Sequence, residues 1–107
     1  MFGLFSPSSA RISTQELEQQ LQAAGAPFVL DVREPAEYQH GHIPGSVLMP
    51  LGTLSQRLHE LPADRRIVVV CRSGARSGAA TGILRKAGLQ ALNMVGGMNA
   101  WRGPVKR

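Results

Sequence analysis

Residues 67–77 read Ile67-Val68-Val69-Val70-Cys71-Arg72-Ser73-Gly74-Ala75-Arg76-Ser77, a β-branched run that leads into a polar loop. A run of four β-branched residues without alternating polar positions is typical of a central strand that is covered on both faces in a parallel sheet. Cys71 therefore stands at the carboxyl end of a predicted strand. Ligands of open parallel α/β sheets bind beyond the carboxyl ends of the strands, so this stretch predicts the position of a site as well as the fold class.

The sequence on either side of this strand alternates between short apolar runs and helical patterns. Ser13 and Glu16 form a capping box that predicts the start of a helix, and residues 28–32 are short, apolar and flanked by breakers, as in a buried strand. Further elements are predicted as an edge strand at 11–13, a short helix from 34, a strand at 47–49, helices at 54–61 and 77–87, and a strand at 92–95. This alternation predicts an α/β fold: a small open parallel sheet of about five strands with helices on both faces.

The length of 107 residues and the apolar fraction of 43% are sufficient for one packed domain. We expect residues 1–10 to be a flexible N-terminal segment and residues 11–107 to be a single domain. The N-terminus lacks a basic stretch followed by a long apolar one, and no later stretch approaches membrane-spanning length. We therefore expect a soluble, cytoplasmic protein that does not bind a membrane.

The net charge of +5 comes mainly from arginine, which accounts for ten of the 12 basic residues. The planar guanidinium group suits oxyanions, so a small anionic substrate is expected, although a solvated basic surface is the simpler interpretation. The arginines are scattered, with no basic run and no interleaved aromatic residues, which argues against nucleic-acid binding.

Cys71 is the only cysteine, so it cannot form an internal disulfide. Without Cys/His clusters at ligand spacing, no metal site and no cofactor are expected. The loop after Cys71 lies between a predicted strand and a predicted helix, where several backbone N–H groups can point to one place and hold an anion. These groups, the helix dipole and the Arg76 guanidinium would favour the thiolate, so Cys71 is the candidate nucleophile. The alternative is a small apolar residue that ends a strand.

The loop residues are the candidate substrate-binding residues. Gly74 is expected to provide a backbone conformation with positive φ, and Ser77 is expected to cap the helix that follows. Asp31 and Arg33 fit an ion pair or loop-anchoring hydrogen bonds better than an acid/base pair, because they lie two residues apart at a strand end. The candidate substrate-binding residues are Arg72, Ser73, Gly74, Ala75, Arg76 and Ser77.

Four stretches of the chain resemble, in order, the signatures of the rhodanese family. They are Asp31-Val32-Arg33-Glu34 with Glu37-Tyr38, then Gly41-His42-Ile43-Pro44-Gly45, then the loop from Cys71 to Ser77, then Gly96-Gly97-Met98-Asn99-Ala100-Trp101. The resemblance covers residues 11–101 and is to single-domain rhodaneses that keep the active cysteine. Two departures are the segment Ser46-Val47-Leu48 and the short segment after Trp101, which puts the usual C-terminal helix in doubt.

The resemblance implies a thiosulfate sulfurtransferase. The Cys71 thiolate would take sulfane sulfur from thiosulfate or a similar small anionic donor and hold it as a persulfide, which a thiol or cyanide acceptor then removes. It also implies that the amides of residues 72 to 76 hold the persulfide, that Arg76 stabilises the anion, that Arg72 contacts the sulfonate of the donor, and that His42 hydrogen-bonds its own loop.

The length of the loop distinguishes the alternatives within this fold. Cys71 and Arg76 give Cys-x4-Arg, one residue fewer than in the related phosphatases, which favours sulfur over phosphate. The alternatives are a persulfide carrier charged by a partner protein, which would act as sulfur donor or acceptor, a phosphatase or arsenate reductase relative, and a catalytically silent regulatory domain.

Overall fold

The computed structural model describes residues 10–107, and its centre is a five-stranded parallel sheet. The strands are β1 (Arg11–Ile12), β2 (Phe28–Asp31), β3 (Val47–Leu48), β4 (Ile67–Val70) and β5 (Ala91–Met94), in the order β1-β5-β4-β2-β3. The central strand β4 pairs in parallel with β2 and with β5, so that Ile67 lies beside Phe28 and Ala91. The predicted parallel sheet is confirmed. Residues 1–9, which make up most of the predicted flexible segment, lie outside the described residues.

The helices flank this sheet, and one predicted helix is wrong. The elements are α1 (Thr14–Leu21), α2 (Pro35–Gln39), the 3-10 helices η3 (Leu51–Gln56) and η4 (Leu58–Glu60), α3 (Ala75–Lys86) and α4 (Gly97–Ala100). The capping box of α1 is present: Glu16 N–H donates to Ser13 Oγ, and Ser13 N–H donates to a Glu16 carboxylate oxygen. Instead of an α-helix at 54–61, two 3-10 turns are interrupted at Arg57, where φ is −124°. Short turns are sufficient there to bury Leu54 and Leu61.

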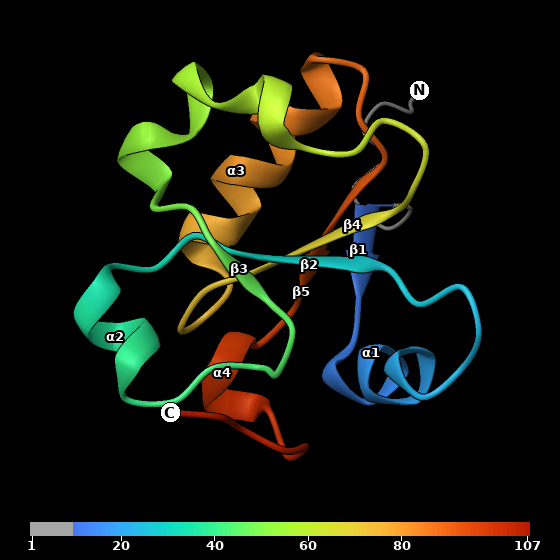
Figure 1. Cartoon of the computed structure of the whole chain (residues 1–107), viewed down its shortest axis with the longest axis vertical. Helices are drawn as coiled ribbons and strands as arrows, with labels where there is room; N and C mark the ends of the chain where they lie inside the picture. Colours follow the sequence, from blue (N-terminus) through green and yellow to red (C-terminus); the bar gives the residue numbers. More distant parts are fainter. Residues whose placement is uncertain (1–9) are drawn as a thin grey trace, which may run out of the picture.

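The strand β4 is buried on both faces because its side chains alternate between two cores. Ile67, Val69 and Cys71 belong to the core on the α3 side, which also takes in Leu54 and Leu84. Val68 and Val70 belong to the opposite core, with Leu17 of α1 and Trp101. In Figure 1, α3 and the 3-10 helices lie above the sheet, whereas α1 and α4 lie below it. Two apolar environments account for a strand that consists of β-branched residues alone.

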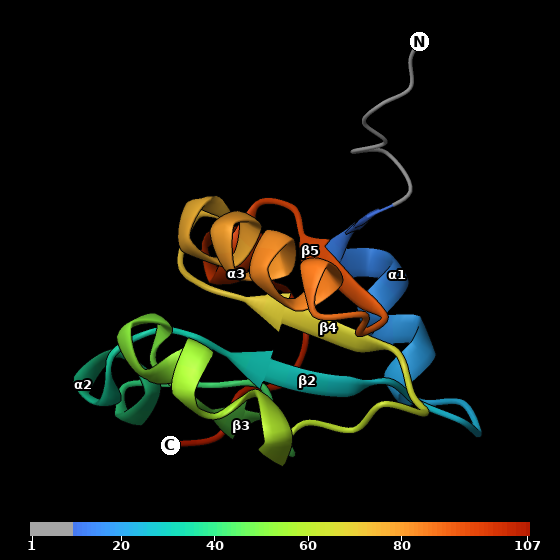
Figure 2. The same ribbon diagram turned by 90° about the horizontal axis from the view of Figure 1, so that it is seen from above.

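The carboxyl ends of β2 and β4 open onto one end of the molecule. Figure 2 shows α2 and the loop that leads into α3 together at this end. Beyond Trp101, residues 102–107 form no helix, and Lys106 instead pairs with His42 through two backbone hydrogen bonds of 2.8 and 2.9 Å. Within the described residues, α4 is thus the last helix. Within residues 10–107, no helix has the length and apolar character needed to cross a membrane.

Candidate active site

Cys71 follows β4 directly, and its sulfur lies inside a ring of loop atoms. The residue is fully buried. Gly74 N–H donates to Cys71 Sγ at 3.1 Å and Ser77 N–H at 3.3 Å, and Ser77 Oγ lies 3.3 Å from the same sulfur. The loop thus places two amides on the sulfur. Of the amides from 72 to 76 that the resemblance implies, Gly74 contacts the cysteine sulfur, and the amide of Ser77 joins it.

These contacts decide the ionisation of the thiol. Burial raises the pKa of Cys71, since the anion is more costly away from water, whereas the amides of Ser77 and Gly74, which donate to Sγ, lower it. The pKa of the thiol is therefore below its usual value. A thiol with a lowered pKa has a larger thiolate fraction at neutral pH and is more reactive as a nucleophile.

Gly74 determines where α3 begins. Its φ is +105°, as expected, and it is the N-cap of α3, so the first helical residue is Ala75. Ser77 is consequently the third residue of the helix, and the prediction that it caps α3 is wrong. Because the N-cap is Gly74, three residues before the predicted cap, both the amide and the hydroxyl oxygen of Ser77 face the sulfur. Ala75 and Ser73 are exposed on the outside of the loop.

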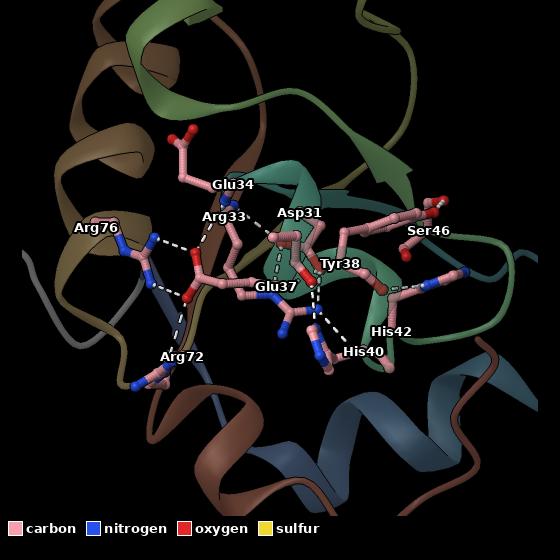
Figure 3. A network of polar contacts seen from close by, with 12 residues as sticks. Asp31, Arg33, Glu34, Glu37, Tyr38, His40, His42, Ser46, Arg72 and Arg76 are labelled. Atoms are coloured by element: carbon pink, nitrogen blue, oxygen red, sulfur yellow. Dashed lines mark hydrogen bonds and ion pairs between the residues drawn. The ribbon is translucent and has the colours of Figure 1, made fainter.

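The two loop arginines meet a carboxylate from α2 (Figure 3). Arg76 donates from both terminal nitrogens to the two oxygens of Glu37, at 2.7 and 2.8 Å, and Arg72 Nε lies 3.7 Å from Glu37. The hydrogen bonds from Arg76 lower the pKa of Glu37 to about 2. The fork of Arg76 is thus occupied, whereas the Arg72 side chain is 66% exposed and available to an anion.

A buried ion pair fixes the chain where α2 leaves the sheet. Arg33 donates through Nε and Nη2 to the Asp31 carboxylate, with the shortest contact at 2.8 Å, and Nη2 also donates to the Gly41 carbonyl. The predicted structural ion pair is therefore confirmed. It ties the carboxyl end of β2 to the loop that follows α2, and α2 carries Glu37.

The Tyr38–His42 pair holds the other end of α2. The two rings stack with centroids 3.7 Å apart, and His42 Nδ1 is 2.8 Å from the Tyr38 carbonyl. Tyr38 donates its hydroxyl proton to the Ser46 carbonyl at 2.6 Å. A loop hydrogen bond by His42 is thus confirmed.

Gly97 brings α4 against the backbone of the loop that follows β4. Met98 N–H donates to the Cys71 carbonyl at 2.8 Å and Asn99 N–H donates to the Arg72 carbonyl at 2.9 Å. Gly97 has φ +60°, and a Cβ there would overlap the carbonyl groups of Arg72 and Cys71. Only glycine permits the backbone of α4 to come this close to the loop, which explains why residue 97 of the Gly96-Gly97 pair is a glycine.

Asn93 of β5 is a site residue that the sequence analysis missed. Its Oδ1 accepts from Ser77 Oγ at 2.5 Å, and its Nδ2 donates to the Gly74 carbonyl at 3.2 Å. The signal in the sequence was a single amide side chain within the otherwise apolar stretch 92–95. A polar side chain that is partly buried in a strand needs hydrogen-bond partners nearby.

Two hollows flank the loop. A groove of about 550 Å³ runs between α3 and the β1/β5 edge, with Ser73 and Gly74 in its wall, and a second hollow of about 390 Å³ is lined by Arg33, Ala36, Glu37, His40 and Arg72. Cys71 itself lines neither hollow, and its neighbours in the loop, Arg72, Ser73 and Gly74, separate the two. Among residues 10–107, no group of three His, Cys, Asp or Glu side chains could hold a metal ion.

The structure is thus a parallel α/β domain that places a buried cysteine beside two backbone amides, at the turn from a strand into a helix. The Rhodanese-like domain family matches residues 13–104 of the chain. The chain therefore belongs to the rhodanese-like domain family, as the four sequence signatures predicted.

Individual relatives agree with this membership. The chain is 38% identical over 91 residues to a sulfurtransferase of Allochromatium vinosum, a match that covers 84% of this chain and 85% of that protein. It is also 38% identical over 100 residues to the Bacillus subtilis protein named "Putative sulfur carrier protein YrkF", covering 92% of this chain but only 54% of that protein. The crystal structure of a rhodanese-like domain protein from Staphylococcus aureus superimposes with a TM-score of 0.85 at 31% identity, covering 90% of this chain and 95% of that one.

Proposed function

We propose that the protein is a sulfurtransferase that moves sulfane sulfur from thiosulfate, or a similar small anionic donor, to a thiol or cyanide through a persulfide on Cys71. The observation that supports this most directly is the pair of amide donors, from Gly74 and Ser77, that meet on the Cys71 sulfur. Donors held in place before the reaction stabilise negative charge on sulfur without reorganising. They serve the thiolate first and the persulfide anion later.

The reaction needs no oxidant and no cofactor. The Cys71 thiolate attacks the outer sulfur of thiosulfate, the S–S bond of the donor breaks, and sulfite leaves with the bonding electron pair. The acceptor then attacks the outer sulfur of the persulfide, and Cys71 is released as the thiolate. Cyanide would leave as thiocyanate and a thiol as its own persulfide. A free thiolate of this kind suits a reducing compartment such as the cytoplasm.

The charges around the loop favour an anionic donor. Arg72 presents an exposed guanidinium beside the loop, and the N-terminus of α3 contributes the positive end of a helix dipole. Glu37 neutralises Arg76 through two short hydrogen bonds, so we assign the donor contact to Arg72 and a loop-bracing role to Arg76. The short loop, with Arg76 five residues after Cys71, encloses a single sulfur atom and disfavours phosphate.

A persulfide carrier is the second candidate. It is supported by the 38% identity to a protein named as a sulfur carrier, although the chain spans only about half of that relative. In this case a partner protein delivers the sulfur to Cys71 and another removes it. The loop chemistry is the same, and only the rate with a free donor distinguishes the two functions.

Intact-mass spectrometry combined with turnover tests the proposal. After exposure to thiosulfate, the wild-type chain should gain the mass of one sulfur atom and lose it on addition of cyanide, whereas Cys71→Ser should remain unchanged. Many turnovers with free thiosulfate would identify an enzyme, and loading only from a protein persulfide would identify a carrier. Turnover of a phosphate monoester without any sulfur transfer would overturn both.

A further inference from the structure

The side chain of Asn93 lies between the two residues that hold the catalytic sulfur. Its Nδ2 donates to the Gly74 carbonyl at 3.2 Å, and its Oδ1 is 2.5 Å from Ser77 Oγ. The chemistry of the partners fixes the orientation of the carboxamide. A carbonyl can only accept, so the NH₂ group must face Gly74, and the oxygen must then face Ser77.

This orientation decides where the single hydroxyl proton of Ser77 lies. Asn93 Oδ1 has no proton to give, so Ser77 must be the donor in that contact. The separation of 2.5 Å is at the short end of the range for O–H···O hydrogen bonds. Ser77 Oγ also lies 3.3 Å from Cys71 Sγ, a contact in which either atom could be the donor. With its proton directed to Asn93, the serine oxygen presents only lone pairs to the sulfur.

We propose that Asn93 is a positioning residue that holds the hydroxyl proton of Ser77 away from Cys71 Sγ, so that Ser77 Oγ accepts from the thiol instead of donating to the thiolate. This inference rests on the proposed role of Cys71 as the nucleophile. The groups that contact the sulfur then have opposite effects on its ionisation. The amides of Gly74 and Ser77 stabilise the thiolate, whereas the Ser77 hydroxyl stabilises the thiol, and Asn93 sets the balance between the two.

The second hydrogen bond of Asn93 steadies the same arrangement. The Gly74 carbonyl accepts from Gly78 N–H at 3.0 Å within α3 and from Asn93 Nδ2, so both of its lone pairs are used. The absence of a side chain at Gly78 leaves room for the carboxamide, because a Cβ there would lie 3.4 Å from Asn93 Nδ2. Asn93 therefore braces the turn at Gly74 and directs Ser77 at the same time.

The charged groups around the loop are Arg72, Arg76 and Glu37 on its outer side, and Arg11 and Arg85 in the groove that Asn93 also lines; a change at Asn93 replaces none of them. Without the acceptor at position 93, the Ser77 hydroxyl is free to turn and donate to the sulfur. A hydrogen bond to the thiolate should then lower the apparent pKa of Cys71 by about one unit, since such bonds to charged groups are among the stronger ones. The same change in a chain without the serine hydroxyl should have no such effect.

The test measures the pH dependence of Cys71 alkylation by iodoacetamide, which needs no sulfur transfer and is therefore independent of the proposed activity. The apparent pKa is compared among wild type, Asn93→Leu, Ser77→Ala and the double variant. We expect Asn93→Leu to lower the pKa, Ser77→Ala not to raise it, and the effect of Asn93→Leu to disappear in the Ser77→Ala background. Thr81→Val is the matched control, because Thr81 bonds the Ser77 carbonyl one turn further along α3, and it should leave the pKa unchanged.

Three results would overturn the inference: a raised pKa in Asn93→Leu, an equal shift in both backgrounds, or a raised pKa in Ser77→Ala. The last would mean that the hydroxyl donates to the thiolate in the wild-type chain. Asn93→Ala provides a second route if the larger leucine disturbs β5. If neither variant at position 93 folds, the pKa of Ser77→Ala by itself shows whether the Ser77 hydroxyl donates its proton to the sulfur.

Discussion

Arg76 donates two hydrogen bonds to the Glu37 carboxylate, and this bidentate pair joins α3 to α2 beside the loop that follows Cys71 (Figure 3). The two residues lie 39 positions apart in the chain. Because Arg76 is the second residue of α3, the pair fixes the start of the helix on which Ser77 lies. The charge of Arg76 is thereby neutralised by Glu37, and Arg72 remains the exposed cation of the loop.

The ion pair predicts a specific acid dependence of stability. The pKa of Glu37 is lowered to about 2 from 4.5, so its contribution is complete above pH 4.5 and is lost as the pH falls toward 2. Glu37→Gln should reduce the free energy of unfolding at pH 7 by about 1 kcal/mol, a modest value because the pair is partly solvated. Urea unfolding at pH 7 and pH 3 should show the difference from wild type shrinking at the lower pH. A difference that stays constant would contradict this account, and Glu18→Gln on α1 is the control.

Glycine at position 97 should be required for both stability and reactivity. Gly97→Ala combines positive φ with an overlap against the Arg72 carbonyl, so unfolding by urea should show a loss of about 2 to 4 kcal/mol. The displaced loop should also alkylate with a higher apparent pKa. The matched control is Gly82→Ala in α3, where a Cβ meets nothing within 4 Å and should raise stability by about 1 kcal/mol. Equal effects of the two changes would refute the role assigned to Gly97.

Replacement of Arg72 should weaken the binding of an anionic donor. In Arg72→Ala, we expect KM for thiosulfate to rise by about tenfold, the equivalent of one lost charge-assisted contact, with little change in kcat. Arg72→Lys should recover part of the loss. Arg66→Ala is the control, because Arg66 precedes β4 at the opposite end of the sheet from Cys71. An unchanged KM in Arg72→Ala would show that Arg72 does not bind the donor and that another group does.

The sequence alone predicted the elements whose signal lies within a few neighbouring residues. The run from Ile67 to Val70 predicted a central strand because such a run is stable only when both faces are covered, and Ser13 with Glu16 predicted the start of α1. Gly74 predicted a turn with positive φ. It did not predict where α3 begins, since that depends on which residue occupies the N-cap, and Ser77 was the stronger capping residue by type.

The features that the sequence left undetermined depend on contacts between distant segments. Glu37 meets Arg76, and Asn93 meets Ser77, only once β2, β4 and β5 lie side by side. The spacing of Leu54, Leu58 and Leu61 fits an α-helix, but the structure buries Leu54 and Leu61 with two 3-10 turns. A periodic pattern reports which side chains are buried, and it does not distinguish one helix from two short turns.

The central claim is that backbone amides keep the Cys71 sulfur ionised, and the pH dependence of alkylation tests it most directly. The rate of iodoacetamide modification should be measured in the native chain and again in concentrated urea, where the amides no longer converge on the sulfur. We predict a lower apparent pKa in the native chain, because the amides of Ser77 and Gly74 donate hydrogen bonds to the sulfur and stabilise the thiolate. A native pKa equal to or above that of the unfolded chain would contradict the account.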